Sequence, residues 1–144
     1  MYTIKTKQSF DSAHFLKDYN GKCANIHGHI WTVEAEIYSQ TIQNEGAFRG
    51  MVVDFGDLKH DLKEIADYLD HSLIIERGSL KQNTLNALLD ENFRVIELDF
   101  RPTAENLAKY MFDKMTEKGY KVRMTAVYET PDNMASYFGW KQVF

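Results

Sequence analysis

The sequence predicts an α+β domain in which two helices cover one face of an antiparallel sheet. Segments with alternating polar and apolar residues lie near both ends of the chain, and two segments with apolar residues three and four positions apart lie between them. Alternation is typical of a strand with one buried face, whereas spacings of three and four are typical of an amphipathic helix. Strands, then helices, then strands again indicate helices gathered on one sheet face.

The N-terminal third is expected to form a three-stranded antiparallel meander. Residues 2–12 alternate in polarity, and residues 27–39 place four apolar residues on one face, Trp31, Val33, Ala35 and Ile37. A polar loop at 17–24 joins these two strands. Asn44-Glu45-Gly46 has turn chemistry, and the third strand is expected at 50–55.

Two helices are expected in the middle of the chain. The first begins after Asp54, a good capping residue, and its apolar stripe is Leu58, Leu62, Ile65, Ala66 and Leu69. The second begins at Pro102-Thr103 and ends at Gly119, and its stripe is Leu107, Ala108, Met111, Phe112 and Met115.

The other segments are assigned by weaker patterns. Residues 80–89 fit a short helix and residues 93–98 a short strand. Residues 120–130 alternate again, and the aromatic-rich segment 133–144 is expected to be an edge strand. Because two helices on one face leave a thin core and free sheet edges, we expect the chain to self-associate.

Length and composition fit one compact domain over residues 1–144. The net charge is −4 and the Lys and Arg residues are scattered, which disfavours nucleic acid as a partner. No apolar stretch approaches the roughly 20 residues of a membrane span, and the N-terminus lacks the apolar block of a signal peptide. A single cysteine, Cys23, cannot form an internal disulfide, so we expect a cytoplasmic protein.

Three of the five histidines lie close together in the sequence. His27 and His29 are one residue apart on a predicted strand, so their side chains point to the same face, and Gly28 lets the backbone bend between them. His14 ends the first strand and can supply a third nitrogen. Zinc accepts neutral imidazoles in a tetrahedral shell and keeps one position open in catalytic sites. We therefore predict a zinc site on these three residues, with His60 at the surface.

Cys23 has three interpretations at this stage. It can be a fourth zinc ligand that closes a structural site, or a buried structural thiol, which is the usual fate of a free cysteine. It can also be a catalytic base or nucleophile, because nearby zinc and histidine favour the thiolate. The residues around it do not distinguish these roles.

Five motifs in order resemble the 6-pyruvoyl-tetrahydropterin synthase superfamily across nearly the whole chain. They are Ser12-Ala13-His14, Cys23-Ala24-Asn25-Ile26-His27-Gly28-His29, Leu69-Asp70-His71, Pro102-Thr103-Ala104-Glu105-Asn106 and Val127-Tyr128-Glu129-Thr130. The three-residue gap between the cysteine and the His-Gly-His unit is similar to the bacterial branch, the 6-carboxy-tetrahydropterin synthases of queuosine biosynthesis.

The resemblance implies the tunnelling fold, in which the sheets of several subunits join into a barrel. It implies a homo-oligomer, a hexamer or a tetramer, with pterin sites at the subunit interfaces. It also implies the zinc ligands His14, His27 and His29.

Further residues take roles by the same resemblance. Cys23 matches the catalytic cysteine, and Asp70 with His71 matches a catalytic relay. Glu129 matches the glutamate that anchors the pterin and is also counted among the catalytic residues. Thr103 and Glu105 match the helix start that lines the pterin pocket.

The implied substrate is 7,8-dihydroneopterin triphosphate, a small molecule. The expected product is 6-carboxy-tetrahydropterin, formed with release of triphosphate and acetaldehyde. One alternative is the pyruvoyl-forming reaction on the same substrate, and another is a non-catalytic zinc-stabilised binding module. Candidates for binding the triphosphate are basic residues, Lys17, Lys22, Arg49, Arg77 and Arg101.

Each implied residue also has a purely structural interpretation. Asp70-His71 can be a helix cap followed by a cation at the helix dipole. Thr103 and Glu105 suit a helix N-terminus, and Glu129 can simply face water. The segment 76–99 is longer than in the shortest bacterial members and can form an arm or a lid.

Overall fold

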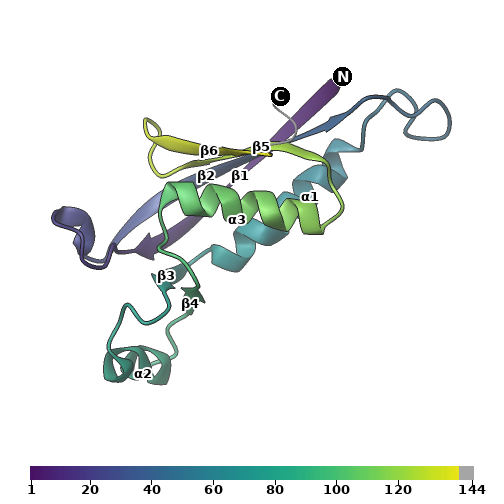
Figure 1. Ribbon diagram of the computed structural model, residues 1–144. Helices are drawn as coiled ribbons and strands as arrows, with labels where there is room; N and C mark the ends of the chain where they lie inside the picture. Colours follow the sequence, from purple (N-terminus) through teal and green to yellow (C-terminus); the bar gives the residue numbers. More distant parts are fainter. Residues whose placement is uncertain (140–144) are drawn as a thin grey trace.

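The computed structural model describes residues 1–139, which form a six-stranded sheet with two long helices on one face (Figure 1). The strands lie in the order β4-β3-β1-β2-β5-β6. They are β1 (Tyr2–His14), β2 (His27–Ser39), β3 (Ser72–Glu76), β4 (Val95–Leu98), β5 (Val122–Tyr128) and β6 (Met134–Phe138). The helices are α1 (Phe55–Leu69), α2 (Gln82–Asp90) and α3 (Ala104–Glu117), and the short 3-10 helix η1 is Lys22–Ala24.

The centre of the sheet is antiparallel, as predicted. β1 and β2 pair along their whole length, from Tyr2 opposite Ser39 to His14 opposite His27. β5 pairs antiparallel with β2, and β6 pairs antiparallel with β5. Because directly opposed residues share a face, this register alone places His14 and His27 side by side.

The third strand predicted at 50–55 is wrong. The Gly50 N–H donates to the Gln43 carbonyl at 2.7 Å, and the Gln43 N–H donates to the Met51 carbonyl at 3.0 Å, so this segment closes its own loop. Gly50 has φ of 84°, a conformation that favours glycine and breaks an extended strand. The expected meander is therefore a two-stranded hairpin followed by a loop that leads into α1.

Two strands run parallel to β1, so the sheet is mixed rather than wholly antiparallel. β3, which the sequence did not reveal as a strand, pairs parallel with β1, and β4 pairs parallel with β3. The short helix and short strand predicted in this region are confirmed as α2 and β4. Alternation does not encode strand direction, and the helix between β3 and β4 makes the crossover that a parallel pair needs.

The core lies between the sheet and the two long helices (Figure 1). All five residues of the stripe predicted for α1 are buried, as are four of the five predicted for α3, with Phe112 half-buried. Asp54 and Thr103 cap these helices as predicted. The expected C-terminal strand corresponds to β6, and its predicted extension through 140–144 lies outside the described residues. Within residues 1–139, no helix has the length and apolar character that a membrane crossing requires.

Candidate metal centre and catalytic residues

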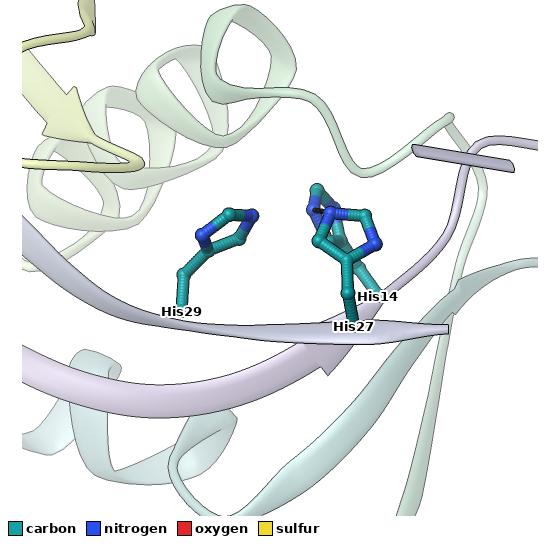
Figure 2. A group of neighbouring side chains, drawn as sticks. All are labelled: His14, His27 and His29. Carbon is teal, nitrogen blue, oxygen red and sulfur yellow. Dashed lines mark hydrogen bonds between the residues drawn. The ribbon is translucent and has the colours of Figure 1, made fainter. Parts of the chain in front are cut away.

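The three predicted zinc ligands meet at the end of the β1–β2 hairpin (Figure 2). His14 is the last residue of β1, and His27 and His29 lie on β2 with one residue between them. One nitrogen from each ring lies within 4.8 Å of the other two. The Nε2 atoms of His14 and His27 are only 3.1 Å apart.

The protonation of two of these rings follows from their other contacts. His14 Nδ1 lies 2.8 Å from the Pro102 carbonyl oxygen, and His27 Nδ1 lies 2.7 Å from the Asn25 carbonyl oxygen. A carbonyl oxygen only accepts hydrogen bonds, so each Nδ1 carries the proton and each Nε2 of a neutral ring presents a lone pair. Two lone pairs that face each other at 3.1 Å repel unless a cation lies between them.

The third ring completes the case for a metal site. His29 Nε2 is buried and has no hydrogen-bond partner among residues 1–139. Burial lowers the pKa of His14 and His29 below the ordinary value, which keeps both rings neutral, as metal ligation requires. Zinc binds imidazole nitrogens at about 2.0–2.1 Å, which in a tetrahedral shell puts two nitrogens roughly 3.3 Å apart. The observed donor set therefore fits zinc.

Glu129 reaches the same cluster from β5. Its Oε1 lies 3.3 Å from His14 Nε2 and 3.6 Å from His29 Nε2. The residue follows the last residue of β5, Tyr128, which pairs with Thr32 of β2. Sequence reasoning named Glu129 as a site residue but did not predict its contact with the imidazoles, because the register between β5 and β2 cannot be read from either strand alone.

Glu129 also lines a cavity of about 620 Å³ that runs along β2. Lys7 lines the same cavity, and sequence reasoning missed it as a basic residue for the triphosphate. Two of the predicted candidates, Arg101 and Lys17, lie together near η1. The Arg101 guanidinium donates a hydrogen bond to the Lys17 carbonyl at 2.7 Å. Arg77 instead pairs with Asp99 at 2.9 Å.

Two further residues hold the imidazoles in place. Trp31 is fully buried, and its ring centroid lies 4.9 Å from that of His14 and 5.3 Å from that of His29, nearly perpendicular to both. The Pro102 carbonyl fixes the orientation of the His14 ring. Sequence reasoning missed this second contact because a backbone carbonyl leaves no mark on residue type.

The segment at the start of α3 contacts the site through a backbone group, the Pro102 carbonyl that accepts from His14. The Thr103 hydroxyl accepts the Asn106 N–H at 3.2 Å, which makes Thr103 the N-cap of the helix that follows Pro102. Glu105 is exposed in the first turn. In the described part of the chain, no hydrogen bond links Thr103 or Glu105 to the histidines, so their predicted contact with a pterin stays a prediction.

Cys23 lies on η1, in the loop that leads to His27. Its side chain is half-buried, and its carbonyl accepts the Leu16 N–H at 2.9 Å, which closes the loop. The group of potential ligand atoms around His14 does not include the Cys23 thiol. The three imidazole nitrogens therefore gather without the Cys23 thiol, and the thiol is half-buried rather than fully buried.

Asp70 and His71 form a bonded pair at the end of α1. Asp70 accepts the Asp11 N–H on Oδ1 and the His71 Nδ1–H on Oδ2, both at 2.8 Å. The Asp11 amide is the main cause that lowers the pKa of Asp70, and the bond to Asp70 raises the pKa of His71. The pair thus has the geometry of a relay in which Asp70 fixes the tautomer and His71 Nε2 is free to exchange a proton.

This pair lies on the opposite side of the sheet from the three imidazoles. Asp11 alternates along β1 with the buried Ser12 and His14 and faces the other way. Asp11 and His71 both line a largely apolar cavity of about 700 Å³. Within one chain, the structure gathers His14, His27, His29 and Glu129 but does not bring Cys23 and His71 together.

Gly28 does not bend the strand but lines both cavities, the one of about 700 Å³ and the one of about 620 Å³. It lies in regular register opposite Ala13, and the nearest atom to a Cβ built on it, the Ser12 carbonyl oxygen, would be 3.8 Å away. The backbone bend expected there is therefore not needed. Glycine instead leaves the cavity wall open where a side chain would project into it.

Comparison with known proteins agrees with this arrangement. Residues 3–139 match the model of the 6-pyruvoyl tetrahydropterin synthase family. The chain belongs to this family. A Haemophilus influenzae protein named 6-carboxy-5,6,7,8-tetrahydropterin synthase is 34% identical over 140 residues, which cover 95% of this chain and 99% of that protein. An Aquifex aeolicus protein of the same name is 31% identical over 126 residues, which cover 81% of this chain and 75% of that protein.

Solved structures confirm the tunnelling fold. The Caenorhabditis elegans 6-pyruvoyl tetrahydropterin synthase aligns with a TM-score of 0.66 at 25% identity, over 96% of this chain and 95% of that one. A Wolinella succinogenes crystal structure aligns with a TM-score of 0.80 at 22% identity, over 96% and 98%, and supports the fold alone. The curled sheet with α1 and α3 on one face is thus the family's architecture.

Proposed function

We propose that the chain is a zinc-dependent lyase that converts 7,8-dihydroneopterin triphosphate and one water molecule to 6-carboxy-5,6,7,8-tetrahydropterin, triphosphate and acetaldehyde. The observation that carries the zinc site is the pair of Nε2 lone pairs that face each other between His14 and His27. The reaction is supported by family membership and by relatives named for this activity. Queuosine biosynthesis and a cytoplasmic location are part of the proposal.

The metal side of the site binds and orients the substrate. When bound, zinc supplies Lewis acidity that makes protons on the hydroxyl-bearing side chain easier to remove. Glu129 accepts two N–H bonds from the amino-pyrimidine edge of the pterin, a charge-assisted contact that sets the ring's orientation. The cavity of about 620 Å³ beside Glu129 has room for such a ring, and its wall on β2 is the sheet face that carries Gly28 and Thr32. We propose that Thr103 and Glu105 also contact the pterin. Lys7 is our candidate for the triphosphate.

Cys23, Asp70 and His71 move protons in the proposed reaction. Cys23 acts as the base, and His71 exchanges a proton through Nε2 while Asp70 holds its Nδ1–H. Because Asp70–His71 lies on the opposite side of the sheet from the imidazoles, we propose that it serves the site of a second copy. The working unit is then a homo-oligomer, a hexamer or a tetramer, with active sites at its interfaces.

The direct test is incubation of zinc-loaded protein with 7,8-dihydroneopterin triphosphate. We expect acetaldehyde in a coupled assay and carboxy-tetrahydropterin by mass spectrometry. A product that keeps the three-carbon side chain would establish the pyruvoyl-forming reaction instead. Absence of both products would end the proposal that this chain is a pterin lyase.

The alternative of a non-catalytic zinc module is tested at Cys23. We expect iodoacetamide to alkylate Cys23 while zinc stays bound, because the thiol is outside the ligand group. Cys23→Ala should keep its zinc and lose turnover by about a hundredfold or more, the usual contribution of a positioned base. Loss of zinc from this variant would favour the structural module, and retained turnover would refute the catalytic role.

A further inference from the structure

The C-terminal end of α1 is held by a side chain from a distant part of the sequence. The Arg94 guanidinium donates one hydrogen bond to the Tyr68 carbonyl and another, of 2.8 Å, to the Asp70 carbonyl. It also lies over the Tyr68 ring, 5.5 Å from the centroid. Arg94 directly precedes β4, so it reaches this turn from the far end of the β3–α2–β4 segment.

The turn at the end of α1 lacks the usual means of stabilising a helix C-terminus. The last turn of α1 contains no basic residue, although a cation there would favour the exposed carbonyls and the helix dipole. The left-handed position that follows is filled by His71, with φ of 51°, where glycine is the usual residue. Arg94 supplies the missing cation and binds the carbonyls on both sides of Leu69.

The remaining carbonyl of this turn is bound by two buried serines. The Ser72 hydroxyl donates to the Leu69 carbonyl at 2.6 Å, and the Ser12 hydroxyl donates to the same oxygen. These contacts anchor Leu69 from β1 and β3 but leave the carbonyls of Tyr68 and Asp70 to Arg94.

We propose that Arg94 is a positioning residue that fixes the turn in which Asp70 presents His71 for proton transfer. The proposal rests on the relay role of His71 in the proposed function. It also assigns a role to the segment 76–99, for which the sequence allows an arm or a lid. This segment brings Arg94 back to the α1 terminus through the pairing of β4 with β3.

The charged groups around His71 are few. Asp70 bonds to it, Asp11 lies beside Asp70, and Arg94 lines the same cavity as His71 and Asp11. Arg77 belongs to the same segment as Arg94 but pairs with Asp99 and Glu97, away from the turn. It is therefore a matched control for the loss of an arginine from this segment.

The test compares Arg94→Ala, Arg94→Lys and Arg77→Ala in the full chain. In Arg94→Ala we expect the pKa of His71, followed by NMR, to fall toward the ordinary histidine value, because the carboxylate of Asp70 is no longer held where it accepts the His71 Nδ1–H. We expect kcat to fall by about tenfold to a hundredfold, the scale of an ångström-sized misplacement, with KM and zinc content unchanged. Arg94→Lys should be intermediate, since an ammonium cannot reproduce the guanidinium fork. Arg77→Ala should leave the His71 pKa unchanged, because Arg77 pairs with Asp99 and Glu97 and does not contact the turn.

An unchanged His71 pKa and kcat in Arg94→Ala would overturn the proposal, as would an equal fall of the His71 pKa in Arg77→Ala. If Arg94→Ala does not fold, the test rests on Arg94→Lys. A wild-type His71 pKa and a wild-type kcat in that variant would overturn the proposal. The NMR titration does not depend on turnover. A chain that makes no pterin product but shows the His71 shift would refute the proposed lyase activity while supporting Arg94 as the residue that fixes the turn.

Discussion

Two backbone carbonyls determine how the histidine cluster can bind a cation. Because Pro102 and Asn25 take the Nδ1–H groups of His14 and His27, the Nε2 lone pairs are directed at each other. The imidazole ligands are therefore preorganised in the metal-free protein, and their side chains need little reorganisation when a cation binds. Removing one ring leaves two donors, which is too few for a stable zinc site.

Replacement of His27 should remove the metal. We expect His27→Ala to lose nearly all of its zinc and all turnover, as measured by inductively coupled plasma mass spectrometry on dialysed protein. His60→Ala is the control, since His60 is exposed on α1 and should leave zinc and turnover unchanged. Stoichiometric zinc in His27→Ala would show that the metal is held elsewhere.

The Asp70–His71 pair should make stability depend on pH in a defined window. The pKa of His71 is raised, so its contribution is complete below 6.5 and is lost as pH rises through the raised folded value. The pKa of Asp70 is lowered, so its contribution is complete above 3.8 and is lost as pH falls through the lowered folded value. The pair therefore stabilises the fold most between these two values.

Asp70→Asn should flatten this dependence, because an amide carries no charge to pair with His71. Urea unfolding at a series of pH values measures the effect, and NMR should show the His71 pKa returning toward 6.5. Asp67→Asn, on the exposed surface of α1 and paired with Lys63, is the control for losing a carboxylate near the helix end. A variant whose His71 still titrates above 6.5 would contradict the pairing.

At the scale of elements, the β1–β2 hairpin and the N-terminus of α3 jointly build the metal site. The hairpin register brings the rings together, and α3 begins where the Pro102 carbonyl can orient one of them. The sequence predicted both elements from local patterns. It did not predict their contact, because the hydrogen bond from His14 to Pro102 joins residues 88 positions apart.

Loss of the α3 cap should weaken both fold and site. We expect Thr103→Ala to lower the free energy of unfolding by about 1 kcal/mol, the usual value of an N-cap, as measured by urea denaturation. Zinc affinity should also fall, because the cap holds the segment that carries the Pro102 carbonyl. Thr84→Ala, at an exposed position within α2, should cost little. Equal effects of the two substitutions would argue against a special role for the cap.

At the scale of the whole molecule, the sheet separates two groups of functional residues. The imidazoles lie on the side covered by the helices, whereas His71, which bonds to Asp70, lines the cavity of about 700 Å³ on the other side. One chain thus contains both groups of proposed functional residues, the imidazole cluster and the Asp70–His71 pair, but does not bring them together. Under the proposed function, assembly of several copies would let both groups act on one substrate.

Subunit mixing tests this arrangement. Cys23→Ala and His71→Ala should each be inactive, and their co-expressed mixture should regain part of the wild-type turnover, because some interfaces then combine an intact Cys23 with an intact His71. A mixture of Cys23→Ala with His27→Ala should regain nothing, since both residues belong to the same half of the site. A mixture of the first pair that stays inactive would contradict a site shared between copies.

The sequence by itself determined the features that depend on spacing along the chain. The ring pair on β2, the helical stripes and the capping residues are set by residues a few positions apart, so local geometry is enough to predict them. The tertiary structure alone decided that residues 50–55 close a loop, that β3 and β4 run parallel, and that Arg94 holds the α1 terminus. These features depend on backbone partners and strand registers far apart in the sequence, which residue type does not encode.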